Sequence, residues 1–453
     1  MFWCYIPTVT SNNHAIVWTI LGLGLISCNR PCDAELTLNG DDAQSATLVW
    51  SARGTESVSL SYDGSGDPEP REATVSSTDG KHTATLWGLQ PLAEVAYSFS
   101  SPDAKTCSDV MTTGGLPAGL PALTVPTWFE DNSSSWRYIA GVTMGEGGTI
   151  FIIDRDGQWR YHQVHESGIT VSAVDVADGA LWYNSFDQDR SNDIGTVHVR
   201  PLLGSTEEIV DTRTEGSHHT FTRLSDGTIT VPSLDIRSWY DPDEDEEIDV
   251  VGDRILEIAP DGTATEIWSL WDSAEPTKHD AWDSDFYGDV GKDWSHANSV
   301  NYSEARDSYL FSLAHLDTIY EINRSTGEVM QVFTQDSVTT GTVYNFQHDP
   351  NWTDDGTLIL ISYPEDEPAM AIEYAVTSAG DLEEIWSFQR ETKGSTLLGQ
   401  ARRLDNGNTF LNFGGLGEMR EVTAEGGTIW QLNAGLGSWF GNATILDTLP
   451  TIP

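Results

Sequence analysis

The stretch TDDGTLILIS at residues 353–362, with AIEYAVTSAGDLEEIWSF at residues 371–388, decides the fold. A short strand leads into an Asp-Gly turn, a second strand follows, and a Gly-containing hairpin then ends in a Trp or Phe strand. The same order recurs along the chain. Clear copies begin at residues 224, 307 and 404, and looser copies begin at residues 145 and 176. The chain is therefore a repeat of small four-stranded units.

Six such units predict a six-bladed β-propeller over residues 127–453. Each blade of a propeller buries its faces only against its neighbours, and closing the ring removes the exposed edges. Segments near residues 127–140 or 434–447 are expected to complete a blade and close the ring. The abundance of Gly and aromatic residues, with β-branched residues alternating with polar ones, also favours an all-β protein.

A smaller β unit precedes the repeats. Residues 32–113 contain short alternating strands, each followed by Gly, Pro, Asp or Ser. The Trp50 strand, the Leu-Gln-Pro turn at residues 89–91 and the alternating strand at residues 95–99 resemble a fibronectin type III domain, which implies a small β-sandwich. Residues 114–126 are rich in Gly and Pro and predict a linker.

The amino-terminal residues predict export. The apolar run AIVWTILGLGLI at residues 15–26 has the length of a secretory signal core and is too short for an ordinary transmembrane helix. It runs into Leu-Ile-Ser-Cys, which resembles a bacterial lipobox ending at Cys28. The resemblance implies that residues 1–28 are a lipoprotein-type signal peptide and that a lipid on Cys28 anchors the protein to the outer membrane. We expect Cys32 and Cys107 to form a disulfide in that compartment.

The charge excludes one class of partner. The chain has 70 acidic and 23 basic residues and a formal charge of -47. Such a field repels nucleic acid phosphates and anionic lipid headgroups. We therefore expect no nucleic acid partner and membrane contact only through the lipid anchor. An anionic substrate would need a local positive patch.

Histidines occupy related positions in several repeats. Counting eight residues back from the turn glycines of two repeats reaches His219 and His348, and His296 precedes the first strand of the blade between them. The first strand of each blade lines the central channel, so these imidazoles are predicted to meet at one mouth of it. Neighbouring strand residues point to opposite faces, so His218 is expected to face away from His219.

Three uses of this histidine cluster are open: metal ligation, acid/base catalysis and nucleophilic catalysis. The other candidate residues at the rim are Asn298 and the Arg402-Arg403 pair. Arginines favour an anionic substrate. A neutral imidazole is a competent nucleophile toward sulfur or phosphorus, and neighbouring donors would stabilise the charge of the transition state.

Four segments together are similar to the propeller repeats of the bacterial arylsulfate sulfotransferase family. They are GSHHTFTRLSDGTI (216–229), DWSHANSVNYSEARDSYLFSLAHLDTIYEINRSTGEV (293–329), FQHDPNWTDDGTLIL (346–360) and GQARRLDNGNTFLNFG (399–414). Members of this family move a sulfuryl group from a phenolic sulfate donor to a phenol acceptor. They work by a ping-pong route through a sulfohistidine, without a nucleotide sulfate donor and without a catalytic cofactor.

The resemblance assigns roles to residues of this chain. It implies that His348 is the nucleophile and that His219, His296 and Asn298 bind the sulfuryl oxygens. The remaining predicted substrate-binding residues are His218, His315, Arg402 and Arg403. The chain departs from the family at Ala314, where an Arg commonly precedes the histidine that matches His315.

Two other classes of function stay open at this point. One is a metal-dependent hydrolase or lactonase that uses the same histidines. The other is a non-catalytic binding protein of the cell surface, which the loss of the Arg at Ala314 favours. Fold and family alone support only a weak inference of function.

Two further segments carry weaker predictions. The carboxylates of Asp241, Asp243, Asp245 and Asp249 have the spacing of a calcium loop, although Glu246 stands where the loop needs Gly. A solvated acidic loop is the first interpretation and structural calcium the second. The aromatic stretch HDAWDSDFYGDVGKDW at residues 279–294 is an insertion that could roof the channel and stack on a phenolic ring, a packed surface loop being the default.

Overall fold

Strands dominate the structure, a computed structural model that describes residues 34–39, 44–51, 59–64, 67, 69–100, 106–144, 148–165, 169–187, 195–203, 208–210, 216–284, 286–287, 290–394, 397–435, 437–450 and 452. Within these ranges the helical elements are single 3-10 turns, namely η1 (Leu270–Asp272), η3 (Ala314–Leu316), η4 (Gln335–Ser337) and η5 (Gly414–Leu416). The prediction of an all-β protein is confirmed.

The predicted signal peptide, Cys28 and Cys32 lie outside the described residues. Cys107 is disulfide-bonded, and its pairing with Cys32 stays a prediction because every other cysteine lies outside the described ranges. Among the helices of the described residues, none has the length and apolar character needed to cross a membrane.

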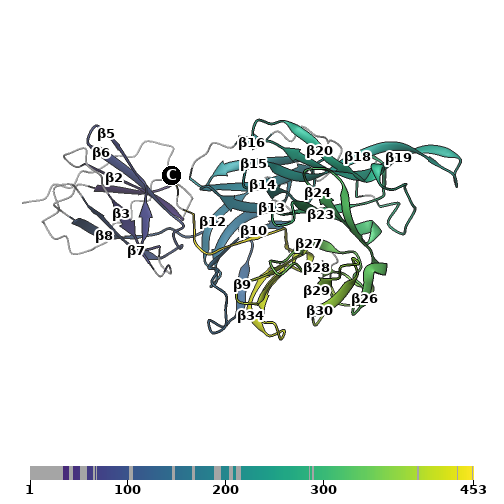
Figure 1. Cartoon of the computed structure of the whole chain (residues 1–453). Helices are drawn as coiled ribbons and strands as arrows, with labels where there is room; N and C mark the ends of the chain where they lie inside the picture. Colours follow the sequence, from purple (N-terminus) through teal and green to yellow (C-terminus); the bar gives the residue numbers. More distant parts are fainter. Residues whose placement is uncertain are drawn as a thin grey trace, which may run out of the picture.

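The amino-terminal unit is a sandwich of two antiparallel sheets (Figure 1). One sheet has the order β1 (Ala34–Leu38), β2 (Ser45–Ser51), β6 (Lys81–Trp87) and β5 (Val75–Thr78). The other has the order β4 (Arg71–Ala73), β3 (Leu60–Tyr62), β7 (Glu94–Ser100) and β8 (Thr106–Thr112). Alternate residues of these strands face inward, and Trp50 fills the core against Phe99 and His82.

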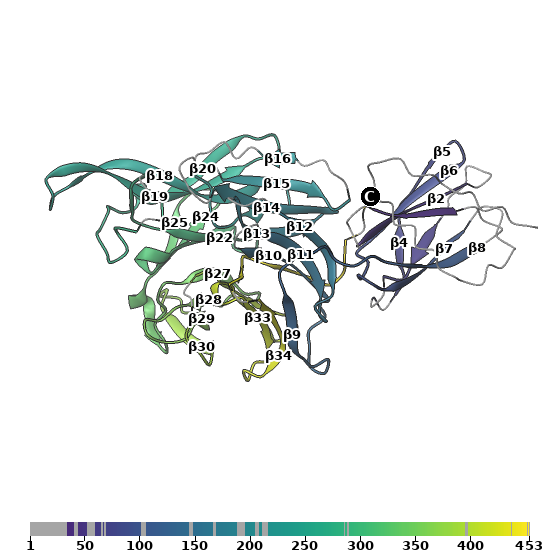
Figure 2. The same ribbon diagram turned by 180° about the vertical axis from the view of Figure 1, so that it is seen from behind.

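Six further sheets follow along the described chain in a propeller-like arrangement (Figure 2). The first contains β10 (Tyr138–Met144), β11 (Thr149–Asp154), β12 (Trp159–Val164), β35 (Trp439–Phe440) and β36 (Thr444–Leu446). The second contains β13 (Ile169–Ala177), β14 (Ala180–Asp187), β15 (Thr196–Pro201) and β16 (Glu208–Val210). The third contains β17 (Thr222–Arg223), β18 (Ile229–Asp241), β19 (Glu246–Ile258), β20 (Ala264–Ser269) and β21 (Lys292–Asp293).

The last three sheets carry the strongest sequence repeats. The fourth contains β22 (Ala297–Ser303), β23 (Ser308–Leu313), β24 (Thr318–Asn323) and β25 (Val329–Phe333). The fifth contains β27 (His348–Trp352), β28 (Leu358–Ser362), β29 (Met370–Val376), β30 (Leu382–Gln389) and β26 (Val338–Thr340). The sixth contains β31 (Gln400–Arg403), β32 (Thr409–Phe413), β33 (Glu418–Val422), β34 (Thr428–Ala434) and β9 (Leu123–Trp128).

The packing of neighbouring sheets explains the apolar runs of the second strands. β22 packs against β27, and β27 packs against β31, so the first strands of successive sheets lie side by side. The second strands then have neighbours on both faces. All residues of β11, β28 and β32 are accordingly buried, which is why these strands read as continuous apolar runs rather than as alternating ones.

The chain closes the arrangement from both ends. β9 pairs with β34 of the sixth sheet, while β35 and β36 pair with β10 of the first sheet. Residues 123–126, predicted as part of the linker, therefore belong to a strand. Pro126 lies in this strand without breaking the sheet because β9 is an edge strand, where a missing N–H group is tolerated.

The sandwich and the first sheet share a buried contact. The fully buried Arg160 pairs with Asp154 at 2.9 Å and donates from Nη1 to the carbonyl oxygens of Gly64 at 2.7 Å and Gly88 at 3.0 Å. The carboxy-terminal residue Leu449 packs in the same cluster as Trp87 of the sandwich. The sequence did not indicate this contact.

We expect Arg160→Met to lower the free energy of unfolding by about 3–5 kcal/mol, because it removes the cation paired with the buried Asp154 carboxylate and the donor to two carbonyl oxygens. Urea unfolding measures the change. Arg254→Met is the matched control, since Arg254 pairs with Glu266 at a partly exposed position and should cost about 1 kcal/mol or less. Equal losses in the two variants would contradict a structural role for the buried contact.

Candidate functional site

Equivalent backbone positions place the site at the start of the first strands. The N–H groups of His315, Tyr363 and Gly415 donate to the carbonyl oxygens of Ser295, Asn345 and Leu397 in the fourth, fifth and sixth sheets. These bonds align the three sheets. The residues that follow each acceptor, His296, Phe346 and Leu398, all have a positive φ, of 48°, 44° and 63°. Two positions further on, the equivalent residues are Asn298, His348 and Gln400.

This alignment corrects the register predicted from the turn glycines. Counting eight residues back from Gly407 reaches Gly399 in the sixth sheet, whereas the hydrogen bonds set the next residue, Gln400, level with Asn298 and His348. The count fails because β27 contains an irregularity, which begins at His348, whereas the pairing of β31 with β32 is regular. A bulge inserts a residue and shifts every position before it.

The three equivalent side chains each bond to the next sheet. Asn298 donates from Nδ2 to the Gln347 carbonyl oxygen at 2.7 Å, and Gln400 donates from Nε2 to the Ala443 carbonyl oxygen at 3.1 Å. His348 Nδ1 lies 2.8 Å from the carbonyl oxygen of Gly399. A carbonyl oxygen only accepts, so Nδ1 of His348 carries the proton and its lone pair is on Nε2.

His348 has the properties of a nucleophile. Burial lowers the pKa of His348 to about 4, and the His296 and Arg402 charges act in the same direction against the opposing effects of Asp349 and the Gly399 carbonyl. The imidazole is therefore neutral at pH 7. Among the described residues, Nε2 of His348 is buried and has no hydrogen-bond partner. A buried unpaired nitrogen needs an explanation, and an attacking lone pair provides one.

Five imidazoles form a continuous chain beside His348. Successive ring centroids from His218 through His219, His296 and His315 to His279 are 4.9, 5.1, 4.4 and 5.1 Å apart. The structure thus brings together four predicted site histidines and adds a fifth. The backbone of His219 and of His296 is in the left-handed region, with φ of 57° and 48°. Such conformations are uncommon for a residue with a side chain and cluster at functional sites.

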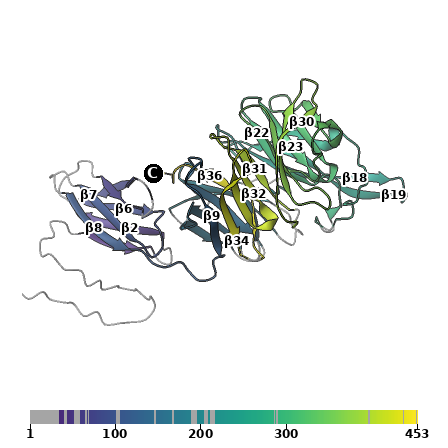
Figure 3. The same cartoon turned by 90° about the horizontal axis from the view of Figure 1, so that it is seen from below.

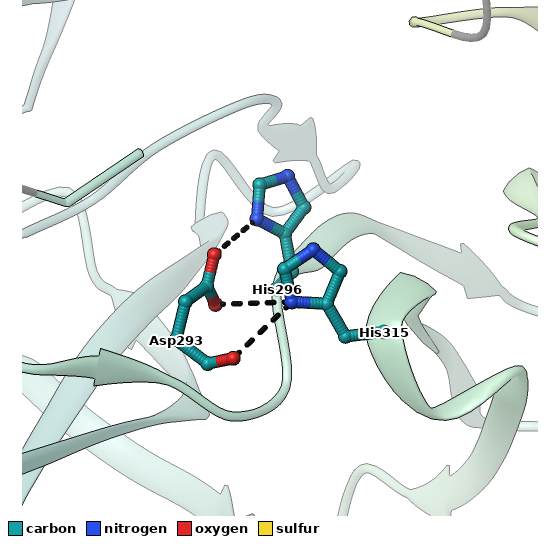
Figure 4. A group of neighbouring side chains, drawn as sticks. All are labelled: Asp293, His296 and His315. Carbon is teal, nitrogen blue, oxygen red and sulfur yellow. Dashed lines mark hydrogen bonds and ion pairs between the residues drawn. The ribbon is translucent and has the colours of Figure 1, made fainter. Parts of the chain in front are cut away.

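Two buried aspartates orient the imidazole chain. Asp293 Oδ2 lies 2.8 Å from His296 Nδ1, and its Oδ1 lies 3.5 Å from His315 Nδ1 (Figure 4). Burial opposes ionisation of Asp293, but the charge and hydrogen bond of His296, together with the charges of His315 and His218, lower the pKa of this carboxyl group. Asp253 Oδ1 lies 2.9 Å from His218 Nε2, and His218 Nδ1 lies 2.7 Å from His219 Nδ1. Both carboxylates are fully buried.

Aromatic rings cover the imidazoles. Phe286, from the insertion at residues 279–294 that we call the roof, stacks on His219 at 5.5 Å and meets His296 edge-on at 4.5 Å. Phe346 lies 5.9 Å from the His315 ring. This roof packs against the long β18–β19 hairpin, which projects at the end of the molecule opposite the sandwich (Figure 3).

The predicted arginines do not join the histidines. Arg402 Nη1 lies 2.7 Å from Asp349 Oδ2, and Arg403 pairs with Glu373 while its guanidinium lies 4.2 Å from the Trp386 ring centroid. Both arginines line a cavity of about 440 Å³ whose lining contains none of the histidines. The prediction that they bind substrate beside the imidazoles is therefore not supported by their positions.

The position of the missing arginine lies within the histidine cluster. The N–H group of Ala314 donates to the carbonyl oxygen of His296 at 3.1 Å, and its side chain is buried. Because Arg402 and Arg403 are paired with carboxylates, neither supplies the charge that an Arg would bring at this position. The polar groups at this position are the imidazoles and Asn298.

The acidic run does not form the predicted calcium site. Asp241 lies at the tip of the β18–β19 hairpin, where Lys278 Nζ contacts its Oδ2 at 2.7 Å and that of Asp243 at 3.1 Å. Asp245 accepts a hydrogen bond from Tyr240, and Asp249 lies in β19 opposite Ser238. Lys278 thus takes the place of a cation between the carboxylates of Asp241 and Asp243, while Asp245 and Asp249 have other neighbours.

One group within the described residues offers metal ligands. The candidate ligand atoms of Asp293, His296 and His315 lie within 4.8 Å of one another. The rings of the two histidines stack with an interplanar angle of 25°, so their lone pairs run nearly parallel rather than toward one point. Both Nδ1 atoms already face Asp293 (Figure 4). The observed geometry is that of a carboxylate orienting two imidazoles.

Sequence analysis missed the two aspartates and Phe346. Asp293 was detectable, because it stands three residues before His296 in the same short segment. Asp253 had no local signal, since it reaches His218 from the middle of β19. Phe346 lies two residues before His348 and was hidden by the register error.

Comparisons with known proteins now identify the family. A search of curated protein sequences finds no match. Among solved structures, the chain is similar to a catalytically inactive virginiamycin B lyase from Staphylococcus aureus with quinupristin, at 12% identity and a TM-score of 0.36, over 58% of this chain and 70% of the other. It is also similar to a structural genomics protein of unknown function from Bacteroides thetaiotaomicron, at 13% identity and a TM-score of 0.32, over 91% and 100%.

A third similar structure is the calcium-binding protein regucalcin from Agrobacterium tumefaciens, at 11% identity and a TM-score of 0.36, over 72% of this chain and 98% of the other. Likenesses at these scores carry no functional argument. The family model described as Arylsulfotransferase (ASST) matches residues 132–434, which is more than half of the 453-residue chain and contains every histidine of the imidazole chain. The protein belongs to the arylsulfotransferase (ASST) family.

Proposed function

We propose that the protein transfers a sulfuryl group from a phenolic sulfate ester to a phenol through a sulfohistidine at His348, without a nucleotide sulfate donor. The observation that carries the proposal is the His348 ring: neutral, held through Nδ1 and with a buried, unpaired Nε2. A fixed lone pair in a dry environment is what attack on sulfur requires.

The reaction has two half-reactions. In the first, the His348 Nε2 lone pair forms a bond to sulfur, the bond from sulfur to the donor oxygen breaks, and the donor phenolate departs. In the second, the acceptor oxygen bonds to sulfur as it loses its proton, and the electron pair of the N–S bond returns to Nε2. No external oxidant or reductant is needed.

Neighbouring groups support the transition state. We assign the sulfuryl oxygens to His296 and to Asn298, whose Nδ2 uses one N–H on Gln347 and has a second one. Phe286 and Phe346 offer apolar faces for the phenolic rings. His218 and His315 position their neighbours rather than bind substrate.

The proposal is tested with 4-nitrophenyl sulfate as donor and phenol as acceptor. We expect a burst of nitrophenolate equal to the enzyme concentration without acceptor, and steady turnover to phenyl sulfate when phenol is added. Absence of both in the folded protein would contradict the proposal and favour a non-catalytic binding protein.

A metal-dependent hydrolase is the second candidate because Asp293, His296 and His315 lie close enough to share an ion. The same assay separates the two. The transferase keeps its burst after dialysis against a chelator and makes phenyl sulfate. A hydrolase loses activity on dialysis, regains it with zinc and makes free sulfate whether or not phenol is present.

We extend the proposal to architecture and location. The six sheets after residue 122 are interpreted as the blades of a six-bladed propeller. The sandwich is interpreted as a fibronectin type III-like domain, because its sheet orders correspond to the ABED and CFG sheets of immunoglobulin-like sandwiches, with β4 as one further edge strand. Export with a lipid on Cys28 would place the enzyme at the outer membrane.

A further inference from the structure

A buried carboxylate reaches the imidazole chain through two rings. Asp253 is fully buried within β19. Its Oδ1 accepts from His218 Nε2 at 2.9 Å, and its Oδ2 accepts from the Ser295 hydroxyl and the Ala297 N–H, both at 2.7 Å. No role in sulfuryl transfer follows from these contacts alone, because they also anchor the start of β22.

When both rings are neutral, the hydrogen bonds fix the protons along this path. A carboxylate only accepts, so His218 carries its proton on Nε2 and presents a lone pair at Nδ1. His218 Nδ1 lies 2.7 Å from His219 Nδ1, so His219 must donate there. The basic nitrogen of His219 is then Nε2. Each link of the path from Asp253 thus sets the tautomer of the next ring.

The His219 ring lies beside the expected acceptor. It stacks on Phe286 with an interplanar angle of 24° and meets His296 at 5.1 Å. A base is required at this position, because an un-ionised phenol is a poor nucleophile toward sulfur until its proton leaves. The first half-reaction with a nitrophenyl donor needs no such proton transfer, since nitrophenolate departs as a stable anion.

We propose, resting on the function proposed above, that Asp253 is a positioning residue that acts through His218 to make His219 the base for the acceptor phenol. The acceptor O–H proton passes to His219 Nε2 as the oxygen bonds to sulfur, and the N–S electron pair returns to His348. The charge formed on His219 is stabilised by the carboxylate behind His218. The proton leaves to solvent, or to the next donor phenolate.

Asp253→Asn tests the proposal because it keeps the shape and reverses the polarity of the contact with His218. At one fixed pH, the nitrophenolate burst should change by less than about 3-fold. Transfer to phenol should slow by about 10²–10⁴-fold, the range for loss of acid/base catalysis. Transfer to a nitrophenol acceptor already ionised at that pH should change by less than about 3-fold. His218→Gln should give the same dependence on acceptor ionisation.

Ser295→Ala is the matched control, since it removes one anchor of Asp253 and leaves the His218 contact in place. It should slow ionised and un-ionised acceptors equally. Equal slowing of all acceptors by Asp253→Asn and His218→Gln, in variants that keep the wild-type burst, would overturn the positioning role and leave the transferase intact. A wild-type protein without a burst would overturn both proposals.

Discussion

His348→Asn is expected to abolish the nitrophenolate burst and to slow sulfuryl transfer by at least about 10³-fold, because it removes the atom that we propose to carry the sulfuryl group. The amide of Asn can still donate a hydrogen bond, so the link between the fifth and sixth sheets through Gly399 has a replacement. The variant should therefore fold, and its unfolding transition is measured beside its activity.

Mass spectrometry of the intact protein gives an independent measurement. Wild-type protein mixed with 4-nitrophenyl sulfate should gain one sulfuryl group on His348, and the variant should gain none. His198→Asn is the matched control, because His198 stacks on Tyr183 in the second sheet, away from the imidazole chain. A wild-type rate in His348→Asn would assign the nucleophile to another residue.

The sequence predicted the elements better than their alignment. The repeats were recognisable because each sheet buries the same strands, as the fully buried β11, β28 and β32 show. Alignment of the first strands failed at bulges. A bulge is set by local backbone at residues such as His296 and His348, and no residue count from a distant turn contains that information.

Charge partners were the least predictable part of the site. In a chain with 70 acidic residues each arginine has many possible carboxylate partners, and Arg402 and Arg403 each pair with one. Asp253 lies beside the imidazoles because β18 and β19 pair as a long hairpin. Its distance in sequence from the histidines therefore gives no indication of the contact. The histidines were predictable because they stand near the start of the first strands, and the first strands of neighbouring sheets lie side by side.

The site therefore works with little positive charge of its own. An arginine in place of Ala314 would bind a sulfate ester more tightly before reaction and after it. A neutral His348 that takes up charge only during the proposed transfer favours the transition state over the bound substrate. Burial keeps His348 and His315 uncharged at pH 7, which has a consequence for stability in acid.

The free energy of unfolding is expected to fall by about 3 kcal/mol for each of His348 and His315 as the pH falls from 6.5 to 4. Burial lowers the pKa of both imidazoles to about 4. In the unfolded chain they bind protons near pH 6.5. Between these values the unfolded chain binds more protons, so the stability from burying neutral rings is complete above pH 6.5 and lost as the pH falls through 4.

Urea unfolding at pH 7 and pH 4.5 measures this loss, and His348→Asn separates its share from that of acidic groups. Asn has no ionisable group, so the variant should lose about 2–3 kcal/mol less than the wild type between the two pH values. Paired carboxylates such as Asp293 contribute equally in both proteins and cancel in the comparison. Identical losses would mean that His348 is already protonated in the folded protein at pH 4.5. Such a ring would have no lone pair on Nε2 to attack sulfur.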